Sequence, residues 1–192
     1  MGNTLFFTAY DDVNGRELWK SDGTAAGTVL VKDIAPSFSG SFPRYLTAVG
    51  NTLFFNAYDD VNGRELWKSN GTAAGTVLVK DIGPGSFGSF PENLTAVGNT
   101  LFFNANDGVN GQELWKSDGT AAGTVLVKDI NPGGSWSSPR NLTAAGSTLF
   151  FTANDGVNGQ ELWKSDGTAL PAAALFPPMP RILSGDCSRQ EP

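Results

Sequence analysis

A repeat with a period of about 48 residues dominates the sequence. Gly-Asn-Thr-Leu-Phe-Phe starts at Gly2, Gly50 and Gly98 and returns as Gly-Ser-Thr-Leu-Phe-Phe at Gly146, so the copies start at equal intervals. A period of about 40 to 50 residues is typical of propeller blades, whereas most helical solenoid repeats are shorter. No helical periodicity of about 3.6 residues accompanies the repeat, so each copy is expected to be a β unit.

Each full copy is predicted to form four antiparallel strands. In the second copy, turn-forming residues at 50–51, 59–63 and 70–75 separate the apolar segments. The strands are expected at residues 46–49, 52–57, 64–68 and 76–82. Leu53 and Phe55 would lie on one face of their strand and Phe54 on the other, so both faces need cover. Stacking the small sheets face to face, as in a β-propeller, would cover them.

The repeat region is predicted to be an incomplete array. Copies occupy approximately residues 2–49, 50–97, 98–145 and a truncated 146–168. The first copy starts at its second strand and the last one lacks its fourth. From 169 to 192 the sequence is rich in proline and no longer repeats, which indicates an irregular tail.

The predicted fold class is therefore all-β, a β-propeller-like array of four-stranded antiparallel blades that does not complete a ring. Closed propellers use about four to eight blades, and this sequence supplies two complete copies and two incomplete ones. Unpaired strand edges and uncovered sheet faces at the ends favour self-association. We expect either oligomeric closure or, if the sequence belongs to a longer array, an open arc.

Composition excludes several classes of function. There is no His and one Cys, which excludes His-based acid–base catalysis, Cys₂His₂ zinc sites and an intrachain disulfide. A net charge of −6 disfavours nucleic acid as a partner. The longest apolar runs are far too short to span a membrane, so no membrane insertion is expected, and no signal peptide is visible after Met1.

A second motif gives the repeat a family resemblance. Glu17 starts Glu-Leu-Trp-Lys-Ser-Asp-Gly-Thr, and copies start at Glu65, Glu113 and Glu161. The motif resembles that of the bacterial ELWxxDGT repeat proteins. The order of strands and turns is also similar to a kelch-type blade, although the kelch double glycine is absent. The resemblance implies a surface or secreted bacterial protein, extracellular or cell-surface in location, with no established catalytic activity.

Acidic turns offer the main candidates for metal binding. The segment Asp11-Asp12-Val13-Asn14-Gly15 gathers oxygen-bearing side chains around a tight bend, and calcium takes six to eight oxygens. Asp and Asn before Gly also satisfy the backbone of a turn, and this structural role is favoured. No cofactor is expected, and calcium is the one alternative. The candidate calcium ligands are Asp11, Asn14, Asp59, Asn62, Asp107, Asn110, Asp155 and Asn158.

Two further recurring positions are interpreted as structural. The Ser-Asp-Gly-Thr turns are similar in residue types and placement to the Asp-box hairpins of sialidase-type propellers, in which the carboxylate caps loop amides. The tryptophans could form a sugar-stacking platform or fill the space between blades, and packing is favoured. These positions are Trp19, Trp67, Trp115, Trp163, Asp22, Asn70, Asp118 and Asp166.

The variable loops suggest where a ligand would bind. Between residues 36 and 43, and in the equivalent loops, the sequence differs most between copies, and Phe38, Phe87 and Trp136 are the candidate contacts. Carboxylates such as Asp11 and Glu17 would suit a glycosidase, but they recur in every copy, whereas an active site is usually a single constellation. The predicted function is a non-enzymatic repeat scaffold with a binding or adhesive surface for a glycan or protein. The alternative is a carbohydrate-binding or hydrolytic propeller fragment.

Overall fold

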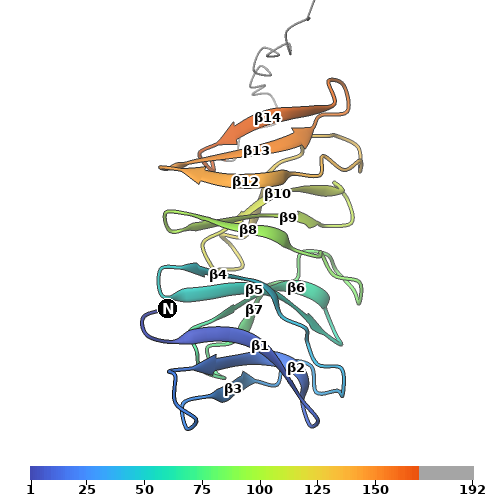
Figure 1. The fold of residues 1–192 in the computed structure, drawn as a ribbon. Helices are drawn as coiled ribbons and strands as arrows, with labels where there is room; N and C mark the ends of the chain where they lie inside the picture. The colour runs from blue at the N-terminus through green and yellow to red at the C-terminus, as the bar shows by residue number, and fades with distance from the viewer. Residues whose placement is uncertain (169–192) are drawn as a thin grey trace, which may run out of the picture.

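Four antiparallel sheets, called blades 1 to 4 in chain order, are stacked face to face in the computed structural model, which describes residues 1–168 (Figure 1). Blades 2 and 3 have four strands each, and blades 1 and 4 have three each. Residues 1–168 contain no helix, and hence none that could cross a bilayer. The predicted all-β, propeller-like array without ring closure is confirmed. The predicted tail, residues 169–192, lies outside the described residues.

The strands of each blade follow one another along the chain as a meander. They are β1 (Leu5–Asp11), β2 (Gly15–Ser21) and β3 (Val29–Lys32) in blade 1; β4 (Arg44–Val49), β5 (Thr52–Asp59), β6 (Gly63–Ser69) and β7 (Val77–Lys80) in blade 2; β8 (Glu92–Val97), β9 (Thr100–Asn106), β10 (Gln112–Ser117) and β11 (Val125–Lys128) in blade 3; and β12 (Arg140–Ala145), β13 (Thr148–Asn154) and β14 (Gln160–Ser165) in blade 4.

The first strand of blade 2 differs from its predicted extent because of a bulge. It starts at Arg44 rather than at residue 46, and its pairing with β5 shifts register between Arg44 and Thr47. Tyr45, inside the bulge, has a φ of 57°, and Asn93 and Asn141 occupy the same position in blades 3 and 4. The bulge inserts one extra residue into β4 opposite β5.

Apolar side chains fill the spaces between blades. Phe54 packs toward blade 3, whereas Leu53 and Phe55 pack toward blade 1, as the alternation along the strand predicts. Between blades 1 and 2 the core contains Leu18, Val31, Ile34, Leu53, Phe55, Ala57 and Trp67. Equivalent residues form the next two interfaces, so the molecule has three similar cores rather than a single central one.

Lysines join each blade to the next at the edge of these cores. Nζ of Lys20 donates to the carbonyl of Gly71 at 2.7 Å, and Nζ of Lys68 donates to that of Gly119 at the same distance. The Lys116 ammonium repeats the bond to Gly167. We call these three bonds the lysine bridges. A second lysine in each blade lies over the next tryptophan: Lys32 over Trp67, Lys80 over Trp115 and Lys128 over Trp163, with Nζ 5.4 to 5.8 Å from the ring centroid.

Candidate binding edge

One edge of the stack carries the crossover loops between blades and the turns that join β1 to β2, β5 to β6, β9 to β10 and β13 to β14. These segments lie on the right of Figure 1. The crossover loops are residues 33–43, 81–91 and 129–139. We call this side of the molecule the binding edge.

The acidic turns on this edge use their oxygens internally. Oδ1 of Asp11 accepts hydrogen bonds from the backbone nitrogens of Val13 and Asn14, at 2.8 and 2.6 Å, and the Asn14 side-chain nitrogen donates to the same carboxylate. Hydrogen bonds from Asn14 hold the pKa of Asp11 below its usual value. The same pairing joins Asp59 to Asn62, Asp107 to Asn110 and Asp155 to Asn158. Each turn thus brings one carboxylate together with one amide, and residues 1–168 hold no group of three or more His, Cys, Asp or Glu that could bind a metal ion.

The Ser-Asp-Gly-Thr turns lie on the opposite edge and are closed by their own hydrogen bonds. Asp22 accepts from the backbone nitrogen and the hydroxyl of Thr24 at 2.9 and 2.7 Å. Asn70 accepts the equivalent bonds through its amide oxygen. Asp118 and Asp166 do the same in blades 3 and 4, which explains why Asn can replace Asp here.

Three of the four repeat tryptophans lie between blades. Trp67 and Trp115 are buried in the interblade cores, and Trp163 packs against the core between blades 3 and 4. Trp19, on the outer face of blade 1, is partly exposed. Rings buried in this way have no face open to a sugar.

Buried glutamates hold each crossover loop in place. Glu65 is fully buried, and its Oε1 accepts the backbone nitrogens of Gly83 and Ser89 at 2.9 and 2.8 Å. The Ser89 hydroxyl donates to Oε2 at 2.5 Å. Glu17 repeats these contacts with Ala35 and Ser41. Glu113 accepts the backbone nitrogens of Ile130 and Ser137 and the Ser137 hydroxyl. We call Glu17, Glu65 and Glu113, with their bound loop groups, the glutamate clasps.

Burial changes the chemistry of these carboxyls. Desolvation raises the pKa of Glu65 and of Glu113 to about 7, and it also raises the pKa of Glu17, although the clasp hydrogen bonds partly oppose the effect. Glu17 has no exposed surface. A substrate therefore cannot reach the carboxyl of Glu17, one of the two groups that a glycosidase built on Asp11 and Glu17 would need.

Close backbone contact further fixes the crossover loops against the neighbouring turns. A Cβ at Gly15 would lie 2.5 Å from the nitrogen of Gly40, and a Cβ at Gly111 would lie 2.5 Å from the carbonyl oxygen of Ser135. Both glycines have positive φ values, 71° and 76°. The backbone nitrogen of Arg16 also donates to the Ser39 carbonyl at 3.1 Å. Loop and turn therefore form one supported unit in each of blades 1 to 3.

The candidate contact residues lie on these supported loops and point into solvent. Phe38, Phe87 and Trp136 are 83%, 84% and 58% exposed. Large apolar side chains are usually buried when the fold allows it. Because the loops are held by the glutamate clasps, the exposed aromatics belong to a fixed surface.

A second set of exposed apolar side chains lies on the same edge and was not predicted from the sequence. One valine in each acidic turn is at least 74% exposed. A Cβ at Gly134 would lie 3.2 Å from the carbonyl oxygen of Val109, and one at Gly111 would lie 2.7 Å from the ring of Trp136, so turn and aromatic loop are adjacent. The sequence feature that could have predicted this set is the apolar residue that recurs in the otherwise polar turn of every copy. The residues are Val13, Val61, Val109 and Val157.

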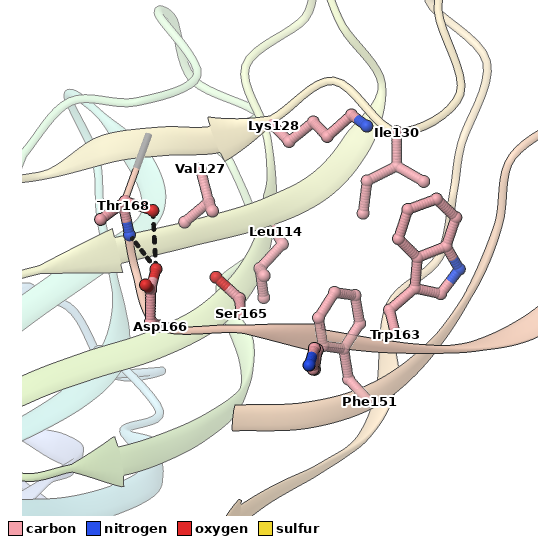
Figure 2. A pocket seen from close by; sticks show the side chains of 10 residues that line it. Leu114, Val127, Lys128, Ile130, Phe151, Trp163, Ser165, Asp166 and Thr168 are labelled. Carbon is pink, nitrogen blue, oxygen red and sulfur yellow. Dashed lines mark hydrogen bonds between the residues drawn. The ribbon is translucent and has the colours of Figure 1, made fainter. Parts of the chain in front are cut away.

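Several hollows lie away from the binding edge, and two of them bear on the choice of site. A groove of about 330 Å³ follows the first strands of blades 2 to 4 and is lined by Tyr45, Asn93 and Asn141 among others. The hydroxyl groups of Thr47 and Thr95 in this groove already donate to carbonyls of the next blade, at 3.3 and 3.4 Å. The second hollow, between blades 3 and 4, has room for about one water molecule, at about 30 Å³ (Figure 2).

The fold, but not the sequence, has recognised relatives. No family profile matches the chain, and no curated protein matches it. The apo AtxE2 isopeptidase is 14% identical with a TM-score of 0.51, and covers 84% of this chain and 24% of its own. Oligopeptidase B from Leishmania major is 15% identical with a TM-score of 0.52, covering 88% and 24%. A structure from a study of two prolyl endopeptidases is 14% identical with a TM-score of 0.53, covering 91% and 27%.

This chain thus spans about a quarter of the length of those peptidases. At such identities the likeness is one of fold alone. It agrees with a propeller-like array, because these peptidases contain propellers.

Proposed function

We propose that the chain is a non-enzymatic repeat scaffold whose binding edge holds an extended ligand through several equivalent contacts. The observation that carries the proposal is the recurrence, in successive blades, of an exposed aromatic residue beside an exposed valine. Both lie on backbone that the glutamate clasps and glycine contacts support. Equivalent contacts at regular spacing favour a ligand with repeating units, because each bound unit raises the effective concentration of the next.

A glycan is the ligand class that we propose first. The flat faces of Phe38, Phe87 and Trp136 suit the apolar faces of sugar rings, and an aromatic ring offers a large contact area at low conformational cost. An extended protein segment is the second ligand class. The resemblance to ELWxxDGT repeat proteins supports an extracellular or cell-surface position, where both kinds of ligand occur.

A glycan array tests this function. The wild-type chain is expected to bind a repeating glycan, and the triple variant Phe38→Ala, Phe87→Ala, Trp136→Ala is expected to lose at least roughly tenfold in affinity. Tyr45→Ala is the matched control, because it removes an aromatic ring from the groove of the first strands and leaves the binding edge intact. An undiminished signal from the triple variant, or a loss in Tyr45→Ala alone, would move the site to the groove.

A hydrolytic propeller fragment is a second candidate, favoured by the likeness in fold to peptidases. The geometry of the acidic residues supports it less, because Glu17 and its equivalents Glu65 and Glu113 are fully buried. A panel of glycosidase and peptidase substrates tests it directly. Turnover that is retained after repurification would reverse the order of the two candidates.

A further inference from the structure

The two outer faces of the stack are the two halves of one recurring interface. Leu18, Leu66 and Leu114 pack against the blade that follows each of them and are fully buried or nearly so, whereas their equivalent in blade 4, Leu162, is 48% exposed. On the opposite side of each interface, Leu53 is buried by the preceding blade, whereas Leu5 in blade 1 is 64% exposed. Within residues 1–168, these leucines therefore have a partner blade inside the stack, whereas Leu5 and Leu162 at its two ends have none.

The polar part of the interface is divided in the same way. Each lysine bridge starts at the lysine that follows the repeat tryptophan in one blade. It ends at the Gly carbonyl of the equivalent Ser-Asp-Gly-Thr or Ser-Asn-Gly-Thr turn in the next blade. Lys164 occupies the donor position in blade 4, is exposed, and has no hydrogen bond within residues 1–168. Gly23 occupies the acceptor position in blade 1, and no lysine of the described chain reaches it. One end thus carries the donor and the other the acceptor.

We propose that these ends bind one another between copies of the chain, with blade 4 of one copy stacked on blade 1 of the next. In this arrangement Leu162 and Phe150 cover Leu5 and Phe7, and Lys164 donates to the Gly23 carbonyl. The interface repeats a packing that occurs three times within each chain. The proposal does not depend on the ligand or on the binding edge.

The sequence favours a second copy over the chain's own C-terminal segment as the partner of blade 4. Each interblade interface uses a tryptophan and a Ser-Asp-Gly-Thr turn from the following blade. Residues 169–192 contain no tryptophan and no Ser-Asp-Gly-Thr. Blade 1 of another copy supplies both, as Trp19 and the turn at 21–24.

Joining unlike faces makes the association heterologous. Such an interface generates a ring where the rotation closes and a longer stack where it does not. Blade 4 has three strands within the described residues, so its apolar face is narrower than that of blade 2 or 3. We therefore expect a dissociation constant in roughly the micromolar range.

Sedimentation of single variants and of their mixture tests the geometry. The full wild-type chain is expected to gain mass above 20.2 kDa as its concentration rises. Leu5→Asp places a carboxylate in the apolar face of blade 1, and Leu162→Asp places one in the apolar face of blade 4. Each variant alone is expected to weaken association by roughly tenfold or more. Mixed together, the two variants still offer one intact pair of faces, so the mixture should form a dimer and nothing larger.

Two controls separate a lost interface from a general effect of the added charge or from misfolding. Tyr45→Asp makes a similar change from an exposed apolar side chain to an acid in blade 2, away from both outer faces and from the binding edge, and it should associate as the wild type does. Circular dichroism should show the wild-type β signal in every variant, since both leucines are already exposed. A 20.2 kDa wild-type monomer at all concentrations, or single variants that associate as strongly as their mixture, would overturn the proposal.

Discussion

Blades 2 and 4 carry nearly the same sequence in different surroundings. The pairing of β13 with β14, from Leu149 with Ser165 to Asn154 with Gln160, repeats the register of β5 with β6. Yet Leu66 is buried between two blades, whereas its equivalent Leu162 lies half exposed. Hairpin register is therefore set within a copy by its turns, whereas burial comes from the neighbouring blades.

The glutamates show the same contrast. Glu65 is sealed beneath its crossover loop, which supplies three hydrogen-bond donors. Glu161 has the same place in its strand but is partly exposed, and no loop of the described residues binds it. Equivalent glutamates thus have different energetic roles, because only some of them are covered by a crossover loop.

The largest predicted effect comes from truncating equivalent leucines. Leu66→Ala should lower the free energy of unfolding by about 2–5 kcal/mol, because it leaves a cavity between two blades. Leu162→Ala should cost less than about 1 kcal/mol at concentrations where the chain is monomeric. Urea denaturation measures both, and equal losses in the two variants would contradict the assignment of burial to neighbouring blades.

The next effect concerns pH. Burial raises the pKa of Glu65 and Glu113 from 4.5 to about 7, so between these values the folded chain retains protons that the unfolded chain releases. The free energy of unfolding should therefore fall as pH rises from 5 to 7.5, by up to about 3 kcal/mol per residue, and change little above that.

The variant Glu65→Gln, Glu113→Gln should reduce this dependence to the part that comes from Glu17, because the amide cannot titrate. At position 65 the amide oxygen can still accept both loop nitrogens. Leu162→Ala in blade 4, which changes no titratable group, should leave the slope unchanged. Urea titrations at pH 5 and pH 8 give the comparison. Asp11 and Asp155 of the acidic turns do not interfere, since hydrogen bonds lower the pKa of both carboxyls and their effect appears only in more acidic solution.

The smallest predicted effect is that of calcium. The acidic turns of blades 2 and 4 have the same internal hydrogen bonds, although their surroundings differ. Their carboxylates already accept turn donors, so adding calcium chloride or a chelator should leave the melting temperature unchanged. A rise of several degrees with calcium would show that the Asp and Asn side chains rearrange around the ion.

The repeat predicted the fold well because its information is local. Turn residues such as Gly50-Asn51 and the alternation of Leu53, Phe54 and Phe55 determine where strands pair and which faces are apolar. Strand ends were less accurate. The bulge at Tyr45 depends on a positive φ value, and a Tyr residue gives no signal in the sequence for this backbone conformation.

The candidate site was predicted in part. Variation between the crossover loops predicted the contact residues Phe38, Phe87 and Trp136. The sequence did not predict how these loops are held, because each is bound by a Glu that lies 24 positions before its Ser partner. Sequence patterns suggested a carboxylate pair at Asp11 and Glu17, and only the folded chain shows Glu17 beneath a loop. Long-range contacts of this kind leave no local periodicity to detect.

The similarity of the interblade faces also bears on how the chain folds. Since blade 1 could dock on blade 3 almost as well as on blade 2, the faces alone do not encode the order of stacking. Connectivity favours the nearest copy only modestly, because doubling the length of a closed loop costs about 0.6 kcal/mol. A stack that leaves out one blade is less stable than the native stack, because both apolar faces of that blade stay uncovered. We therefore expect refolding to pass through misordered stacks that must open before the native order is reached.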